Sequence, residues 1–139
     1  MQLKYSIPLL IVMTFMVGCG SQPGLRGKVV FSDDKSPLTQ GIVVFQSEKG
    51  IARGELDKNG NYVVGSLKAN DGLPPGTYKV YLETTELYHP NPKGGLPIIE
   101  YVIDHKYEKS NTSGITVEIK RSTTFDFEVD RIDSSKTNK

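Results

Sequence analysis

A run of oxygen-bearing side chains near the middle of this 139-residue chain has the spacing of a metal-binding loop. The stretch Asp57-Lys58-Asn59-Gly60-Asn61 places Asp57, Asn59 and Asn61 at alternate positions, as in the first half of a calcium loop. Such a loop requires an acidic ligand at its twelfth position, which here is Lys68. Because Asn-Gly is also typical of hairpin turns, we expect a structural turn and no calcium site.

The two histidines of the chain are the next candidates for metal chemistry. His89 and His105 are 16 positions apart, with Glu100 and Asp104 close to them in the sequence. A zinc site requires three or four converging ligands, usually His or Cys in tight spacing. We therefore expect solvent-exposed loop histidines, no metal site and no cofactor.

Nucleophilic chemistry has little support in the sequence. A strained nucleophile elbow follows the pattern Gly-x-Ser-x-Gly. Gly65-Ser66-Leu67 lacks the second glycine of that pattern, and Ser113-Gly114 lacks the first. No glycine-rich phosphate loop is present either, so we predict that the protein is not an enzyme and assign no catalytic residue.

Tyr88-His89-Pro90-Asn91-Pro92 is the best candidate for recognition. An aromatic ring on a proline-restrained loop can stack on a sugar or a peptide, so Tyr88 and His89 are our candidate recognition residues. The alternative is that Tyr88 covers one edge of the domain, because loops serve both purposes. The absence of tryptophan weakens a carbohydrate platform.

Cys19, the single cysteine, ends a segment with the features of an export signal. Lys4 is the only charged residue before Arg26, and the apolar run from Pro8 to Val17 is too short for a membrane-spanning helix of about 20 residues. Met16-Val17-Gly18-Cys19 resembles the lipobox of bacterial lipoproteins. The resemblance implies that residues 1–18 are removed and that Cys19 carries two or three acyl chains, which anchor the protein stably to a membrane. An ordinary cleaved signal and a retained membrane anchor are the alternatives.

The charge of the remaining chain is balanced. Of the 17 Lys and Arg residues, only Lys4 lies in the signal, which leaves 16 against 16 Asp and Glu. A nucleic-acid-binding protein needs a basic face to meet the phosphates, so we predict no nucleic-acid partner. The length allows one small domain at residues 26–131, after a lipidated tether at 19–25 and before a disordered tail at 132–139.

Alternation of apolar and polar residues predicts an all-β domain. Period-two runs indicate strands with one buried face, and short valine-rich runs indicate more central strands. The expected strands are Gly27–Phe31, Gly41–Phe45, Tyr78–Leu82, Ile115–Lys120 and Phe125–Asp130. We also expect Glu55–Leu56 and Tyr62–Val64 to flank the Asp57–Asn61 turn as a hairpin. Glu86–Pro97, which is rich in Pro and Gly, is expected not to pair as a normal strand.

Several motifs of the chain occur together in one known family. Leu25–Phe31 followed by Pro37–Phe45, then Asp57–Tyr62 and Pro75–Val80, resemble carboxypeptidase regulatory-like, or transthyretin-like, domains. Lys106-Tyr107, Thr112–Val117 and Thr124–Phe127 are similar to small bacterial lipoproteins of this fold. The resemblance implies a single transthyretin-like (prealbumin-like) β-sandwich of about seven strands.

Two classes of function follow from these expectations. The first is a lipid-anchored, non-enzymatic cell-envelope protein that binds or spaces an envelope protein or glycan. The second is an accessory or carbohydrate- or peptide-binding subunit of an envelope hydrolase. Regulatory-like domains usually lie beside a catalytic domain, and this chain has no length left for one, which favours the first class. Gly20 after Cys19 is not the acidic residue that some bacteria use to retain lipoproteins at the inner membrane, so either membrane is compatible.

Overall fold

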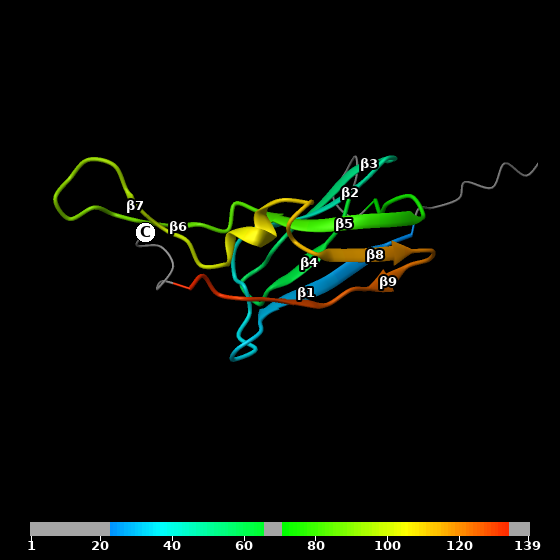
Figure 1. Ribbon diagram of the computed structural model, residues 1–139, viewed down its shortest axis with the longest axis horizontal. Helices are drawn as coiled ribbons and strands as arrows, with labels where there is room; N and C mark the ends of the chain where they lie inside the picture. The colour runs from blue at the N-terminus through cyan, green and yellow to red at the C-terminus, as the bar shows by residue number, and fades with distance from the viewer. Residues whose placement is uncertain (1–22, 66–70, 134–139) are drawn as a thin grey trace, which may run out of the picture.

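The computed structural model describes residues 23–65 and 71–133 of the chain, and it shows an all-β sandwich (Figure 1). The first sheet is centred on β1 (Leu25–Phe31), which pairs antiparallel with β4 (Asn61–Val63). On its other side β1 pairs in parallel with β9 (Thr123–Thr124) and then with β10 (Phe127–Val129). Because β9 and β10 follow the same edge of β1, they act as one interrupted strand.

The second sheet is antiparallel throughout and has the order β3-β2-β5-β8. It consists of β3 (Gly50–Glu55), β2 (Ile42–Ser47), β5 (Gly76–Glu83) and β8 (Ile115–Ile119). With β9 and β10 counted as one strand, three strands of the first sheet and four of the second make seven. The predicted sandwich of about seven strands is confirmed for the part of the chain that the structure describes.

The core lies between the two sheets and is formed by the predicted apolar faces. In β5 the side chains of Tyr78, Val80 and Leu82 are buried and alternate with more exposed ones. An aromatic cluster fills the centre, in which the ring of Phe45 lies 6.0 Å from Tyr62 and 6.5 Å from Phe125. Phe127, in β10, joins this cluster with its ring 5.6 Å from that of Phe125. Aromatic pairs at these separations stabilise beyond the area they bury.

The interruption between β9 and β10 is built by a close approach of three segments. The hydroxyl of Tyr62 donates a hydrogen bond to the carbonyl oxygen of Phe125, and Lys28 N–H donates to Asp126 Oδ1 at 2.8 Å. A Cβ atom on Gly27 would lie 1.9 Å from the Phe125 oxygen, so only glycine fits at this point of β1. The Asp126 side chain thus replaces a backbone partner where the strand is interrupted.

The Asp57–Asn61 turn is present, and the predicted hairpin around it forms in part. Asp57 N–H donates to the Asn61 oxygen at 2.9 Å, and Arg53 and Gly65 exchange two backbone hydrogen bonds at 3.0 Å in the same antiparallel register. β3 before the turn belongs to the second sheet, whereas β4 after it pairs with β1 in the first sheet. The turn therefore connects the two layers of the sandwich. The buried ring of Tyr62 and its bond to Phe125 hold β4 in the first sheet, so the partial hairpin bridges the two sheets and does not belong to one of them.

The segment Glu86–Pro97 also differs from the prediction. Within this segment, β6 (Leu87–His89) forms a strand that pairs antiparallel with β7 (Ile98–Glu100). The two strands make a two-stranded sheet separate from the sandwich. The prolines stand outside both strands, at positions 90, 92 and 97, where they interrupt no ladder. Pairing is therefore compatible with the composition that indicated an irregular loop.

Helical structure is limited to one turn in the described residues, η1 (His105–Glu108). The absence of a substantial helix, predicted from the sequence, is confirmed for this part of the chain.

The predicted domain boundaries shift slightly. Leu25, assigned to the tether, is buried in β1, and Ile132, assigned to the tail, donates its N–H to the Val102 oxygen at 3.3 Å. The predicted signal segment at residues 1–18, Cys19 and Lys68 lie outside the described residues.

Candidate functional site: the β6–β7 arm

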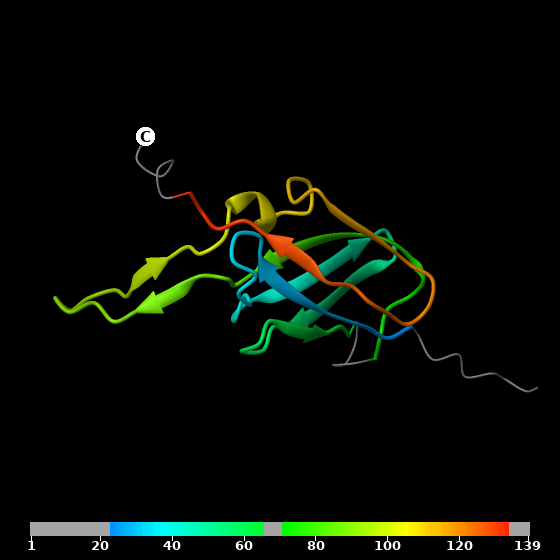
Figure 2. The same ribbon diagram turned by 90° about the horizontal axis from the view of Figure 1, so that it is seen from below.

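The two-stranded sheet forms an arm, Glu86–Tyr101, that projects from one end of the sandwich (Figures 1 and 2). β6 and β7 pair through Leu87 with Glu100, Tyr88 with Ile99, and His89 with Ile98. Among the described residues these strands pair with each other and with no other strand. An isolated two-stranded hairpin is at best marginally stable in water, so further contacts would stabilise the arm.

Exposed apolar side chains concentrate on this arm. Seven large hydrophobic residues are exposed in the described part of the chain, and the five on the arm are Tyr88, Leu96, Ile98, Ile99 and Tyr101. Leu96 at the tip is 85% exposed, which is the largest exposure of the set. Apolar surface gathered in one place marks an interaction site more reliably than scattered residues do. The other two, Ile51 and Val63, lie on the sandwich.

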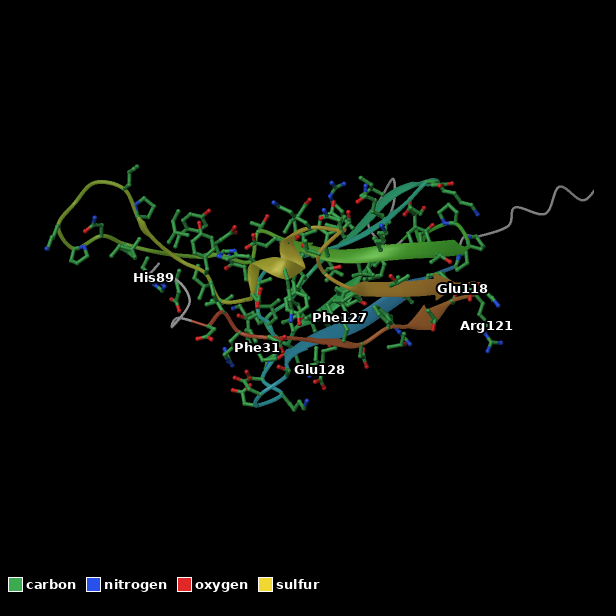
Figure 3. The ribbon with its side chains drawn as sticks, viewed as in Figure 1. Phe31, His89, Glu118, Arg121, Phe127 and Glu128 are labelled. Atoms are coloured by element: carbon green, nitrogen blue, oxygen red, sulfur yellow. The ribbon has the colours of Figure 1, made fainter. Side chains whose placement is uncertain are left out.

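The two faces of the arm differ in chemistry. Directly paired residues share a face of a sheet, so Tyr88 and Ile99 lie together, and Tyr101 follows on the same face. The opposite face carries Leu87 and Ile98 together with a polar pair, His89 and Glu100. The Nε2 and Oε2 atoms of that pair are 2.6 Å apart, and both side chains are about half exposed. Figure 3 shows His89 on the arm, away from the sandwich. This polar pair links β6 to β7 and leaves the aromatic face free of formal charge.

At its base the arm is fixed to the sandwich. Gln40 Nε2 donates to the Glu86 carbonyl oxygen at 2.6 Å, and the neighbouring Thr85 is buried. A hollow of about 270 Å³ lies at this junction. The apolar residues that line it are Phe31, Pro37, Leu38, Leu87 and Val102. The arm is therefore a positioned element with a partly apolar recess beside it.

An ionic network near the base holds the last strand and the end of the described chain. Lys106 Nζ donates to Asp130 Oδ2 at 2.6 Å, and this bond, with others from Ser32 and Tyr107, lowers the pKa of Asp130 to about 2. Arg131 lies 3.6 Å from the centre of the Phe31 ring and pairs with two neighbouring carboxylates. The hydrogen bonds from Ser36, followed by the Arg131 charge, lower the pKa of Asp34 to about 2.

The predicted recognition residues Tyr88 and His89 both lie on this arm. Tyr88 is 58% exposed and lies on β6, in the two-stranded sheet of the arm. Sequence reasoning missed Leu96, Ile98, Ile99 and Tyr101, which form most of the same surface. The sequence offered one sign of a second strand in the arm, the apolar pair Ile98-Ile99 directly after Pro97.

The histidines are not brought together. His89 pairs with Glu100 on the arm, and His105 Nδ1 lies 2.8 Å from Glu108 Oε1 in η1. Asp104, the other candidate ligand, accepts a hydrogen bond from Lys106 N–H at 2.9 Å and caps η1. No group of three metal-ligating side chains occurs within residues 23–65 and 71–133.

The Asp57 side chain has a structural role in the turn. Asp57 Oδ1 accepts hydrogen bonds from the backbone N–H groups of Asn59 and Asn61, at 2.8 and 2.9 Å. The Asn61 bond makes the largest contribution to lowering the pKa of Asp57 below its ordinary value. Because this carboxylate faces the backbone of its own turn, the turn is stabilised by local hydrogen bonds.

The chain matches no protein-family model and no curated protein. Among solved structures it is similar to a variant of BcpA, the major pilin subunit of Bacillus cereus, with a TM-score of 0.51 and 16% identity over 79% of this chain. A second BcpA crystal structure has a TM-score of 0.47 and 15% identity over 81% of this chain. The chain spans about 30% of the length of these pilins, and the likeness concerns the fold alone. It places the protein in the class of β-sandwich domains. Within the described residues, no helix is long and apolar enough to cross a membrane.

Proposed function

We propose that this protein is a lipid-anchored, non-enzymatic module of the bacterial cell envelope, in which the sandwich carries the arm as a surface for binding another envelope component. The observation that carries the proposal is the concentration of exposed apolar side chains on a hairpin that projects from the sandwich. A soluble domain rarely maintains such a surface unless a partner covers it. The family we favour is the carboxypeptidase regulatory-like lipoproteins named above.

The position of Cys19 is compatible with anchoring close to a membrane surface. Five residues lie between Cys19 and the start of β1 at Leu25, and such a segment reaches at most about 20 Å when fully extended. Gly24 N–H donates to Ser122 Oγ at 2.9 Å, so the sandwich already holds the chain at that point. Lipid on Cys19 would therefore hold this end of the sandwich near the membrane, and the arm lies at the other end (Figure 1).

A non-enzymatic role is supported by how the candidate chemical groups are used. Asp57 is bonded to its own turn, His89 to Glu100, and His105 to Glu108. Each of these side chains is bonded to a structural partner, and the three side chains do not share one cleft. BcpA, which has a similar fold, is a pilin subunit, and a structural role for a related sandwich agrees with this proposal.

Replacing Cys19 with Ser tests the anchoring half of the proposal. Cells that produce the full chain or the C19S variant are fractionated, and the protein is followed by immunoblot. We expect the parent in the membrane fraction and the variant in the soluble fraction. A variant that sediments with membranes like the parent would show that lipid on Cys19 is not the anchor.

The binding half is tested by chemical crosslinking of intact cells followed by capture of the full chain. The control variant carries Tyr88→Asp and Ile99→Asp, which alter the arm and leave the sandwich core untouched. We expect crosslinked species with the parent and a loss of them with the arm variant. A crosslinked envelope hydrolase that depends on the arm would favour the alternative function, an accessory subunit. Identical crosslinks with both variants would rule out the arm as the binding surface.

A further inference from the structure

We propose that the partner of the arm is a second copy of this chain, joined by antiparallel pairing of β6 with β6 of the other copy. This inference rests on the proposed binding role of the arm and names the occupant of its free edge. The two hairpins would together form a four-stranded antiparallel sheet with the order β7-β6-β6-β7. Three or more strands are what a sheet requires for stability of its own.

A two-fold axis fits the register of β6. In a symmetric antiparallel pair the central residue faces its own copy, so Tyr88 would face the partner's Tyr88. Leu87 would then face the partner's His89, and the reverse. The central row of the sheet would read Ile99, Tyr88, Tyr88, Ile99, which is apolar throughout. Aromatic pairs directly across strands are among the favourable cross-strand contacts.

Charge distinguishes the β6 edge from the β7 edge. Leu87, Tyr88 and His89 include no carboxylate and no Lys or Arg, whereas β7 ends with Glu100. Pairing through β7 would bring two Glu100 carboxylates to diagonal positions across the new interface, where like charges repel. Pairing through β6 leaves both Glu100 side chains on the outer strands, each still beside its own His89. The β6 edge is therefore the one that is complementary to itself.

Three-residue strands alone bury too little surface for a stable dimer, which typically covers about 1,200–2,000 Å² in total. Antiparallel pairing also places the tip of each arm alongside the base of the other. The tip carries Leu96, 85% exposed, and the base carries the hollow of about 270 Å³, which is lined in part by Phe31, Leu87 and Val102 and in part by polar residues. Leu96 of one copy thus has a recess to enter on its partner. The contact at each end adds the surface that the strand pair lacks.

The rest of the fold permits this arrangement. The first described residues lie at the end of the sandwich opposite the arm in both views (Figures 1 and 2). Two copies joined by their arms would have their N-terminal ends at the two far ends of the pair, so lipid on both Cys19 residues would anchor the pair with its long axis along the membrane.

Site-specific disulfide crosslinking of the full chain in intact cells tests the register directly. In Tyr88→Cys, the two introduced residues would face each other with Cα atoms about 4.5–5.5 Å apart, within the range that a disulfide spans. In Ile99→Cys the two residues would be separated by three strand spacings, about 14 Å, beyond that range. Val63→Cys is a matched control on the sandwich, since Val63 is 47% exposed and Ile99 is 45% exposed. The parent chain measures any background from Cys19.

After oxidation with copper phenanthroline, we expect a band of twice the chain mass for Tyr88→Cys, at least tenfold stronger than for Ile99→Cys or Val63→Cys. A dominant Ile99→Cys band would overturn the β6 register. Equal bands for Tyr88→Cys and Val63→Cys would indicate random collision. A Tyr88→Cys adduct of another mass would keep the arm as a binding surface and refute the second copy as its occupant.

Light scattering on the purified, detergent-solubilised full chain gives an independent measurement. We expect dimers for the parent, and at least a tenfold weaker dimer for Leu96→Asp, with Ile51→Asp as the control on an exposed residue of the sandwich. A parent chain that is monomeric at 100 µM would overturn self-association, while the fractionation of Cys19→Ser would still report on anchoring by itself.

Discussion

Truncating Phe127 should separate the buried face of the last strand from its exposed face. Phe127 packs against the core and lies 5.6 Å from the ring of Phe125 and 6.4 Å from that of Tyr62. A fully buried Phe→Ala change costs about 3–5 kcal/mol, through lost transfer energy and the cavity left behind. Because Phe127 is only partly buried, we expect Phe127→Ala to lower the free energy of unfolding by about 2–4 kcal/mol. That is a large part of the 5–15 kcal/mol typical of a small domain.

The neighbouring Glu128→Ala is the matched control. Glu128 lies on the outer face and pairs with Lys35 Nζ at 2.7 Å, with both side chains about half exposed. Figure 3 labels the two residues, which point to different sides of the strand. Exposed ion pairs contribute about 0–1 kcal/mol, so Glu128→Ala should barely change stability.

Urea unfolding followed by circular dichroism measures both variants. With a slope of about 1–3 kcal/mol per molar urea, a loss of about 3 kcal/mol lowers the midpoint by roughly 1–3 M, while Glu128→Ala should shift it by less than about 0.5 M. Equal midpoints for the two variants would show that the faces of this strand are assigned wrongly. An unchanged midpoint for Phe127→Ala would refute its packing role.

Three further predictions concern the same sandwich. Gly27→Ala should cost about 1–3 kcal/mol in urea unfolding, because its Cβ would meet the Phe125 oxygen. Gly24→Ala should not, because its Cβ would make only an ordinary van der Waals contact with Ser122 Oγ; equal stabilities would contradict the close approach. The pKa of Asp130 is lowered to about 2 in the folded protein, below about 3.9 unfolded, so its contribution to stability is complete above about pH 4 and is lost as the pH falls through 2. Asp130→Asn should flatten that part of the stability profile, and an unaltered acid profile would count against the Lys106 pair. Chelator should leave the unfolding midpoint unchanged, because Asp57 is bonded to its own turn; a clear loss of stability would reveal a metal site.

Strands with one buried face could be predicted from the sequence because burial leaves a period-two pattern. β5 and β8 follow the predicted alternation, with Tyr78 and Ile119 buried and Lys79 and Glu118 exposed. The sheet to which each strand belongs could not be predicted in the same way. The turn at Asp57 is specified locally, but β4 joins the first sheet through a contact between Tyr62 and Phe125, 63 positions apart.

The arm was missed for a related reason. Leu87–His89 and Ile98–Glu100 have no fully buried face, so no alternation marks them as strands. Pro and Gly between them indicate a loop, which is correct for residues 90–97 but not for the flanking residues. The arm is held by backbone pairing, by the His89–Glu100 contact and by Gln40 at its base, none of which has a pattern in the sequence. The candidate site was therefore only half visible, through Tyr88 and His89.

The edges of the sandwich differ from the edge of the arm in a way that bears on function. β8 is an edge strand of the second sheet, and its end carries the exposed Glu118, with Arg121 just beyond it (Figure 3). The opposite edge, β3, carries the exposed Arg53 and Glu55. Charges at such positions discourage pairing with other chains.

β6 is a short strand followed by Pro90, and it carries no such charges. Its three residues carry no carboxylate, Lys or Arg, and the arm's tip adds an almost fully exposed leucine. Charged residues lie on both edges of the second sheet and are absent from β6. Positions that depart from a general folding rule tend to be functional. An edge without such charges, on a projecting hairpin, is suited to adding a strand. That is why we assign the contact surface of this protein to β6, and the sandwich to the task of holding it in position.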